Sequence, residues 1–218
     1  MKIRTLNDLQ DAVDKEMAWR KHELSAVRSN VATARNHAKD TAIRAGIALL
    51  YAHWEGGIKN MATYYLEYVA MQGFSYGRLK PNFLAISIKN DLASFTESNK
   101  STIHTTIVLD VLQKQADKAR IPVDGVIKTA SNLNSSIFVE IMATIGLDDS
   151  QYQSSYKLID EILVSKRNSI AHGERLEALS LDESRYFEIH EKVLNLLIQF
   201  ATDISNAASL RLFLQPTE

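Results

Sequence analysis

Residues 40–71 read DTAIRAGIALLYAHWEGGIKNMATYYLEYVAM. Large apolar side chains recur in this stretch every three or four residues, at Ile43, Ile47, Leu50, Trp54, Ile58, Met61 and Tyr65. This spacing puts them on one face of an α-helix, and such a face needs a partner helix to cover it. Gly56 and Gly57 weaken the helix, because glycine loses the most conformational freedom on folding, and they indicate a close backbone approach or a kink. The stretch predicts a long, buried helix.

The rest of the chain is also predicted to be helical. Residues 8–37 lack Gly and Pro and are rich in residues of high helix propensity, which predicts a second long helix. Further helices are predicted at 83–95, 102–119, 134–145, 154–171 and 182–208, with Ser135 and Ser136 as possible caps of the third. Residues 72–81 are predicted to be a loop, and 123–128 a loop or a short strand. We expect one all-α domain over residues 1–218, an up-and-down bundle in which residues 72–150 form a helical elaboration.

Composition limits the classes of protein that the chain can belong to. Of its 218 residues 45% are hydrophobic and 23% charged, and only 8 Gly and 3 Pro are available for tight turns. The absence of cysteine excludes disulfides, a thiolate nucleophile and cysteine-containing zinc sites, and it favours a reducing cytoplasm. No signal peptide or membrane-spanning run is apparent. With a net charge of -1, contact with a nucleic acid would need a local basic patch.

A basic run occupies the first long helix and the start of the second. It contains six basic residues against two acidic ones, at Arg20, Lys21, Arg28, Arg35, Lys39 and Arg44. Lys21, Arg28 and Arg35 recur at intervals of seven residues, which places them on roughly one helix face. Such a run is typical of a solvated face, and the alternative is a stripe that binds the phosphates of RNA.

The tripeptide His53-Trp54-Glu55 matches half of a zinc deaminase signature. The other half requires cysteines, which the chain lacks, so this chemistry is excluded. His53 and Glu55 are interpreted as polar positions beside a core tryptophan. The Glu55 carboxylate could also support a site that another helix contributes.

Residues 164–173, VSKRNSIAHG, end the predicted helix 154–171. At about 100° per residue, Asn168 and His172 lie side by side one turn apart, turned away from the apolar face that carries Ile159 and Leu163. Arg167 lies at the border of the two faces. These polar groups therefore face solvent or a groove that something else completes, and a second copy of the chain is the simplest candidate.

Arginine, asparagine and histidine together suit one kind of chemistry. Histidine can transfer protons near neutral pH, and arginine offers a forked donor for a phosphate and its transition state. Asn168 could orient the imidazole or donate to a phosphate oxygen, and Lys166 is a further candidate for substrate binding. The set suits cleavage of RNA by its own 2′-hydroxyl without a metal or other cofactor. The alternative is purely structural, with Arg167 and His172 complementing the helix C-terminus.

The hexapeptide from Arg167 to His172 resembles the R-x4-H motif of the HEPN superfamily, helical proteins of prokaryotic toxin–antitoxin and antiviral systems. The segments 50–56 (LYAHWEG), 131–135 (SNLNS) and Gly146-Leu147 also resemble segments of full-length bacterial HEPN proteins. The resemblance implies a helical bundle and a homodimer whose two motifs share a cleft. It further implies metal-independent endoribonuclease activity, which some members of the superfamily have lost.

Three functions follow from these observations. The first is a HEPN endoribonuclease acting as a toxin or defence effector, with an antitoxin or another protein as a possible partner. The second is an inactive helical module that dimerises and binds RNA or a partner protein, and the third is a nucleotide-binding regulator. The spacing alone is not specific, because it recurs from Arg185 to His190. That copy lacks the Asn and the terminal Gly, and we interpret it as a chance match.

Overall fold

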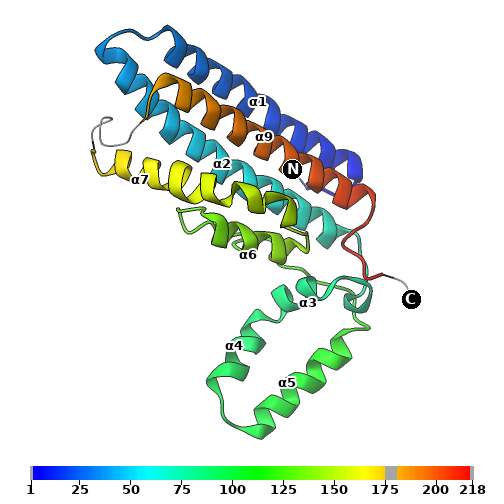
Figure 1. Cartoon of the computed structure of the whole chain (residues 1–218). Helices are drawn as coiled ribbons and strands as arrows, with labels where there is room; N and C mark the ends of the chain where they lie inside the picture. Colours follow the sequence, from blue (N-terminus) through cyan, green and yellow to red (C-terminus); the bar gives the residue numbers. More distant parts are fainter. Residues whose placement is uncertain (1, 175–180, 217–218) are drawn as a thin grey trace.

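The computed structural model describes residues 2–174 and 181–216, which are helical and contain no strand. Three long helices pack against one another, α1 (Leu6–Thr33), α2 (His37–Met71) and α9 (Glu183–Ser209). Figure 1 shows α1 running antiparallel to α2 and α9, while the short helix α7 (Ser165–Ala171) lies along α2 on the side away from α1. The predicted all-α class, with long N-terminal helices packed in a bundle, is confirmed.

The apolar stripe of α2 forms the centre of the core. All seven residues of the stripe have exposed fractions of 1% or less. They pack with apolar residues of α1 and α9 in one cluster, which includes Leu9, Leu24, Val193, Leu197 and Phe200. The first helix ends at Thr33, four residues earlier than predicted, because residues 34–36 form the connection that reverses the chain.

Gly56 and Gly57 give space to neighbouring side chains. A Cβ atom on Gly57 would lie 2.7 Å from Cδ2 of Leu197, and one on Gly56 would lie 3.0 Å from Nη2 of Arg20. The predicted close approach is therefore present, but the groups that approach are side chains of α9 and α1 and not a backbone. A larger residue at either position would push the three long helices apart.

The middle of the chain departs from prediction in two places. The predicted helix 83–95 is two helices, α3 (Pro81–Ser87) and α4 (Lys89–Glu97), because Ile88 leaves the helical conformation and buries its side chain. The helix predicted at 102–119 is α5 (Ser101–Lys114). It ends early because the backbone oxygens of Gln115 and Asp117 accept hydrogen bonds from residues 77 and 76.

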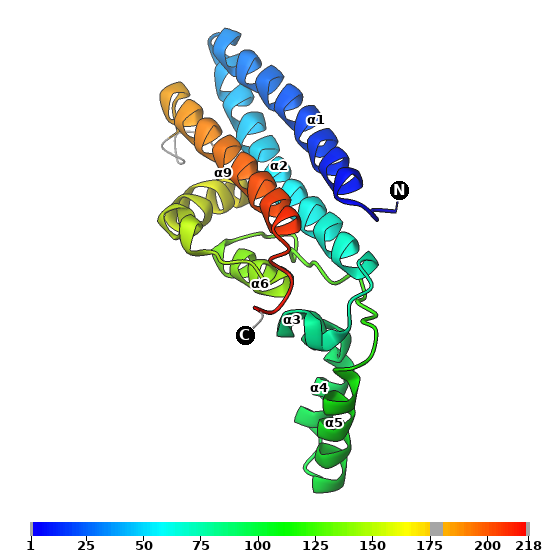
Figure 2. The same ribbon diagram turned by 90° about the vertical axis from the view of Figure 1, so that its right-hand side faces the viewer.

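Helices α4 and α5 form a hairpin that projects from the bundle (Figures 1 and 2). Neither helix has a buried residue. The hairpin instead exposes large apolar side chains, at Leu92, Phe95, Ile103, Val108, Leu109 and Leu112. The loop 72–81 at its base contains a short 3-10 helix, Tyr76–Arg78, and the buried Tyr76 ring fixes this loop to the body.

Residues 123–128 adopt no regular structure, so the short strand offered as an alternative is wrong. They lead into α6 (Ser135–Ile145), whose N-cap is Asn134 and not Ser135 or Ser136, because Asn134 Oδ1 accepts the N–H of Ile137. Gly146 ends α6 with a φ of +74°, and the helix ends at Ile145, the residue predicted from the position of this glycine.

The helix predicted at 154–171 is not a uniform α-helix. It consists of a 3-10 helix (Ser150–Ser155), a π-helix (Leu158–Val164) and then α7. A π-helix has more residues per turn than an α-helix. The angle around the helix axis that we expected between the apolar residues Ile159 and Leu163 and the motif at 167–172 therefore does not apply. The wider turn also brings the Asp160 carboxylate to the start of α6, where it accepts the N–H and the hydroxyl of Ser135 at 2.7 and 2.5 Å.

Across the described parts of the chain, no helix is both long enough and apolar enough to cross a membrane.

Two buried histidines give the bundle a predictable pH dependence. Burial lowers the pKa of His53, with Arg20 adding to the effect and Glu23 and Glu16 opposing it. Burial also lowers the pKa of His190, whose Nε2 donates to the Leu24 oxygen at 3.0 Å. In the unfolded chain these histidines bind protons below about pH 6.5, whereas in the folded chain their lowered pKa values keep them neutral. The stability present above that pH is therefore lost as the pH falls towards the pKa values of the folded state.

We therefore expect the thermal unfolding temperature to fall between about pH 7 and about pH 5.5, in the window where these pKa shifts act. His190→Gln, which keeps a donor near the Leu24 oxygen but cannot be protonated, should show a smaller fall than the parent. His22→Gln, at an exposed histidine of α1, is the control and should keep the parent's dependence. Equal falls in all three proteins would contradict this account.

Candidate functional site

Three segments that are far apart in sequence meet at the motif helix α7. The guanidinium carbon of Arg167 lies 3.8 Å from the centre of the Tyr51 ring on α2. Arg167 Nη2 donates to the Ser131 backbone oxygen at 2.7 Å, and Nη1 donates to Asn168 Oδ1 at 2.8 Å. A stacked ring below and two acceptors at the edge fix both the position and the plane of the guanidinium group.

The loop that carries Ser131 is itself fastened to α2. The N–H of Leu133 donates to the Tyr51 hydroxyl at 2.7 Å, and Trp54 Nε1 donates to the Leu133 oxygen at 3.2 Å. Ala130 and Ser131 both have a φ of +53°, a left-handed conformation that costs energy for residues other than glycine. The contacts from α2 and α7 are what hold this loop in place.

Arg167 keeps hydrogen-bonding capacity after these contacts. Its guanidinium has five N–H groups, and the two bonds to Ser131 and Asn168 use two of them. Nε is shielded from solvent and has no hydrogen-bond partner among residues 2–174 and 181–216. The side chain as a whole is only half-buried, so the second N–H groups of Nη1 and Nη2 are the ones left for an anionic oxygen that approaches α7.

His172 lies in the turn that follows α7. Its backbone N–H donates to the Asn168 oxygen, and Gly173 continues the turn with a φ of +83°. His172 is exposed, and no hydrogen bond joins its imidazole to Arg167 or Asn168 within the described residues. The structure therefore brings Arg167 and Asn168 together but leaves His172 exposed and apart from them, and the groove completed by another chain stays a prediction.

Asn168 has a role that the sequence did not predict. Its Oδ1 accepts from Arg167, and its Nδ2 donates to Asn132 Oδ1 at 3.3 Å. The amide thus orients the arginine and the loop, whereas we expected it to orient the imidazole or to bind a phosphate directly. The expectation that Asn168 shares an outward face with His172 holds for the backbone only, because the amide is half-buried against the loop.

Glu55 lies beside the site, one helical turn after Tyr51. Burial raises the pKa of the Tyr51 hydroxyl, and the neighbouring Glu55 carboxylate raises it further, while the hydrogen bond from the Leu133 N–H opposes the shift. The hydroxyl therefore stays protonated around neutral pH, where it accepts the N–H of Leu133. Glu55 is thus a neighbour of the site through Tyr51, and the supporting role of its carboxylate stays a prediction.

The basic residues predicted to bind substrate are dispersed. Lys166 is half-buried on α7, next to Arg167. Lys21 is exposed on α1, and the guanidinium of Arg28 lies 4.5 Å from the centre of the Phe187 ring. Arg35 lies in the connection after α1, so the seven-residue spacing does not place it on a helix face. In Figure 1 this connection is at the end of the bundle where α7 also ends.

The basic run is not a single surface. Arg20 is 3% exposed and forms an ion pair with Glu16 at 2.5 Å. Lys39 pairs with Glu183 at 2.8 Å, and Arg44 donates to the Glu174 backbone oxygen, which holds the chain just after the motif. Half of the six side chains thus hold the bundle together.

Tyr51, Ser131 and Asn132 were not predicted to act at the site. These three residues lie in segments 50–56 and 131–135, which resemble segments of bacterial HEPN proteins. No sequence pattern indicated that the two segments meet at Arg167. Among the residues that the structure describes, no group of three or more His, Asp or Glu side chains is placed to hold a metal ion.

The second arginine–histidine pair lies elsewhere. Arg185 pairs with Glu188 at 2.6 Å, and His190 is 4% exposed inside the bundle. Its imidazole is engaged with the Leu24 oxygen and is not accessible to a ligand from solvent.

An all-α bundle with an Arg-Asn-x3-His set on a short helix is the arrangement expected of a HEPN protein. The model of the RiboL-PSP-HEPN family matches residues 15–206, and the chain therefore belongs to this family within the HEPN superfamily. No curated protein and no solved structure matches the chain significantly.

Tyr51→Phe tests the fastening of the loop. The variant keeps the ring under Arg167 but removes the acceptor for the Leu133 N–H, which is then buried without a partner. We expect the free energy of unfolding to fall by roughly 1–3 kcal/mol, with faster hydrogen exchange at the Leu133 amide. Tyr68→Phe, on the same helix and with no hydrogen bond to the described residues through its hydroxyl, is the control. It should change stability by less than about 0.5 kcal/mol. Equal effects of the two variants would refute the fastening.

Proposed function

We propose that the protein is a metal-independent endoribonuclease that cleaves RNA through attack of a 2′-hydroxyl on the adjacent phosphorus. The observation that carries this proposal is the fixed guanidinium of Arg167, with unused N–H groups on Nη1 and Nη2, on the short helix that leads directly into the exposed His172. The substrate supplies the nucleophile, so the protein has only to transfer protons and stabilise charge.

In the proposed reaction the O2′–P bond forms and the P–O5′ bond breaks. A His172 imidazole takes the proton of the 2′-hydroxyl, and an imidazolium gives a proton to the departing 5′-oxygen. Arg167 donates to the non-bridging oxygens, whose charge grows in the transition state, and Asn168 holds Arg167 in plane. The products carry a 2′,3′-cyclic phosphate and a 5′-hydroxyl.

A homodimer suits this chemistry. One imidazole cannot accept and donate a proton at the same moment, and the His172 of one chain stands apart from its own Arg167 contacts. Two copies that face each other through their α7 ends would supply both proton-transfer groups to one cleft. We propose Lys166, Lys21, Arg28 and Arg35 as phosphate-binding residues along such a dimer, and Glu55 as support for Tyr51.

The wider role is proposed on the same basis. The chain would act as a single domain in the cytoplasm, as a toxin or antiviral effector, with an antitoxin or another protein as its partner. The alternative is an inactive module that binds RNA or a partner protein. One observation favours it, since Arg167 already has a structural role in holding the loop 130–133.

The decisive experiment is cleavage of end-labelled RNA in excess chelator. His172→Ala should lower kcat by about 100-fold or more, because it removes the proton-transfer group. Arg167→Lys keeps the charge but loses the forked donor, and it should also cleave more slowly. His22→Ala, at an exposed histidine of α1, is the control and should cleave at the parental rate.

Mass spectrometry of the products should show 2′,3′-cyclic phosphate ends. If His172→Ala cleaves as fast as the parent, or if the parent binds RNA without cleaving it, the enzymatic proposal is wrong. The second result would support the inactive module.

A further inference from the structure

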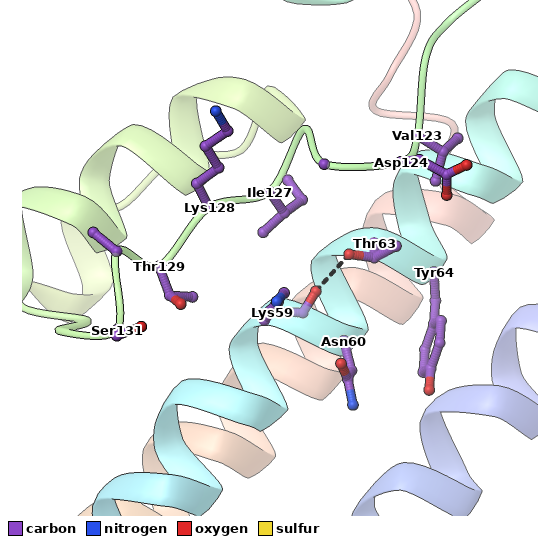
Figure 3. Close-up of a pocket in the computed structure, with 12 residues that line it drawn as sticks. Lys59, Asn60, Thr63, Tyr64, Val123, Asp124, Ile127, Lys128, Thr129 and Ser131 are labelled. Carbon is purple, nitrogen blue, oxygen red and sulfur yellow. Dashed lines mark hydrogen bonds between the residues drawn. The ribbon is translucent and has the colours of Figure 1, made fainter.

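A cavity of about 530 Å³ lies between α2 and residues 123–131 (Figure 3). Lys59, Asn60, Thr63 and Tyr64 line it from α2, and Ile127 and Thr129 line it from the facing segment. Ser131 lines the same cavity, and its backbone oxygen is the acceptor for Arg167 Nη2. The cavity and the motif arginine therefore share Ser131 as a neighbour.

We propose that this cavity binds a nucleotide of single-stranded RNA that flanks the phosphate held by Arg167, and that it favours a base with an exocyclic amino group over uracil. The proposal rests on the proposed function. It adds a binding site next to the motif and a source of sequence preference.

The cavity has the size and lining of a site for a flat aromatic group. Its volume falls within the range of about 300–1,000 Å³ found for small-ligand sites. Val123 and Ile127 provide apolar surface, Tyr64 provides an aromatic ring, and Asn60 and Thr129 provide polar groups. Bases of single-stranded RNA are bound in this way, by stacking and by hydrogen bonds to their edges.

Asn60 is held in one orientation by a buried carboxylate. Glu16 is 7% exposed, and its Oε1 accepts Asn60 Nδ2 at 2.7 Å while its Oε2 accepts the Tyr64 hydroxyl at 3.3 Å. Burial opposes the charge of Glu16, but hydrogen bonds from Arg20 and Asn60 keep the pKa of Glu16 below its usual value. A carboxylate only accepts hydrogen bonds, so the NH₂ group of Asn60 must face it.

This orientation leaves Asn60 Oδ1 as an acceptor on the cavity wall. An acceptor pairs with the amino group of cytosine or adenine, or with the 2-amino group of guanine when that edge faces it, whereas uracil bound in the orientation of cytosine presents its O4 oxygen, which the acceptor would repel. The ion pair between Glu16 and Arg20 thus has a consequence at the surface, because it fixes the wall of the cavity as well as the packing of α1 on α2.

The charges at the cavity are compatible with an RNA backbone. Lys59 is exposed, and its ammonium group has no ion-pair partner within residues 2–174 and 181–216. Asp124 is the acidic residue of the lining, and Lys128 also borders the cavity although its side chain points away from α2 in Figure 3. Lys59 is two helical turns beyond Tyr51, or about 12 Å along α2, which neighbouring nucleotides of an extended strand can span.

The test uses short oligonucleotides in which only one nucleotide keeps its 2′-hydroxyl, so that a single bond can be cleaved. The bases that flank this bond are varied one at a time. Thr63→Trp fills the cavity without touching Glu16, and Lys59→Glu reverses its free charge. We expect each to raise KM about tenfold or more with little change in kcat, and Thr63→Trp to abolish the preference for amino-bearing bases.

Two matched controls are available. Thr106→Trp replaces a threonine on α5 with the same intrahelical bond that Thr63 makes, and Lys192→Glu reverses an exposed charge on α9. Both should behave like the parent. If the cavity variants match these controls in KM and in base preference, the binding site is refuted while the nuclease stands.

If the parent protein cleaves no RNA, the proposed function fails and the cavity is tested by binding alone. Fluorescence anisotropy of labelled single-stranded oligonucleotides should then show weaker binding to Thr63→Trp than to Thr106→Trp, and weaker binding of oligouridine than of oligoadenosine to the parent. Equal affinities, or no binding to the parent, would overturn the proposal.

Discussion

The contact of Arg167 with Tyr51, Ser131 and Asn168 is the interaction on which the candidate site depends. It joins the motif helix to α2 and to the loop before α6, both of which lie more than thirty residues earlier in the sequence. The loop pays an energetic cost for its left-handed residues, and the arginine is one of the groups that stabilise it. The group proposed to bind phosphate is therefore preorganised before any ligand arrives, which is the condition for strong electrostatic stabilisation.

Helix α2 is the element that connects the bundle to this site. One of its sides presents Tyr51 and Trp54 to the loop, and another presents His53, Gly56 and Gly57 to the Arg20 side chain of α1. Asn60 extends the second arrangement towards the cavity through Glu16. A buried ion pair adds little net stability as a rule. The contribution of the pair between Arg20 and Glu16 is therefore the geometry that it imposes on its neighbours, such as Asn60.

Much of the fold could be predicted from the sequence, and the reasons are local. The stripe from Ile43 to Tyr65 predicted α2 because helical periodicity is a property of the segment itself, and Gly146 predicted the end of α6. The burial of Arg20 could not be predicted, since it depends on glycines of another helix. The π-helix before α7, the break at Ile88 and the half-buried amide of Asn168 could not be predicted either, because each involves a tertiary contact. The partners in these contacts are Ser135 of α6, the core and Asn132 respectively. The Arg167–His172 pattern located the site, but the residues that hold Arg167 are distant in sequence.

The central claim is that the guanidinium of Arg167 is held rigidly in the free protein. Nitrogen-15 NMR of the arginine side chains tests it directly, because restricted rotation gives separate Nη–H signals while free rotation averages them. The account predicts separate, slowly exchanging signals for Arg167 and averaged signals for the exposed Arg35. A single averaged Arg167 signal, indistinguishable from that of Arg35, would contradict it.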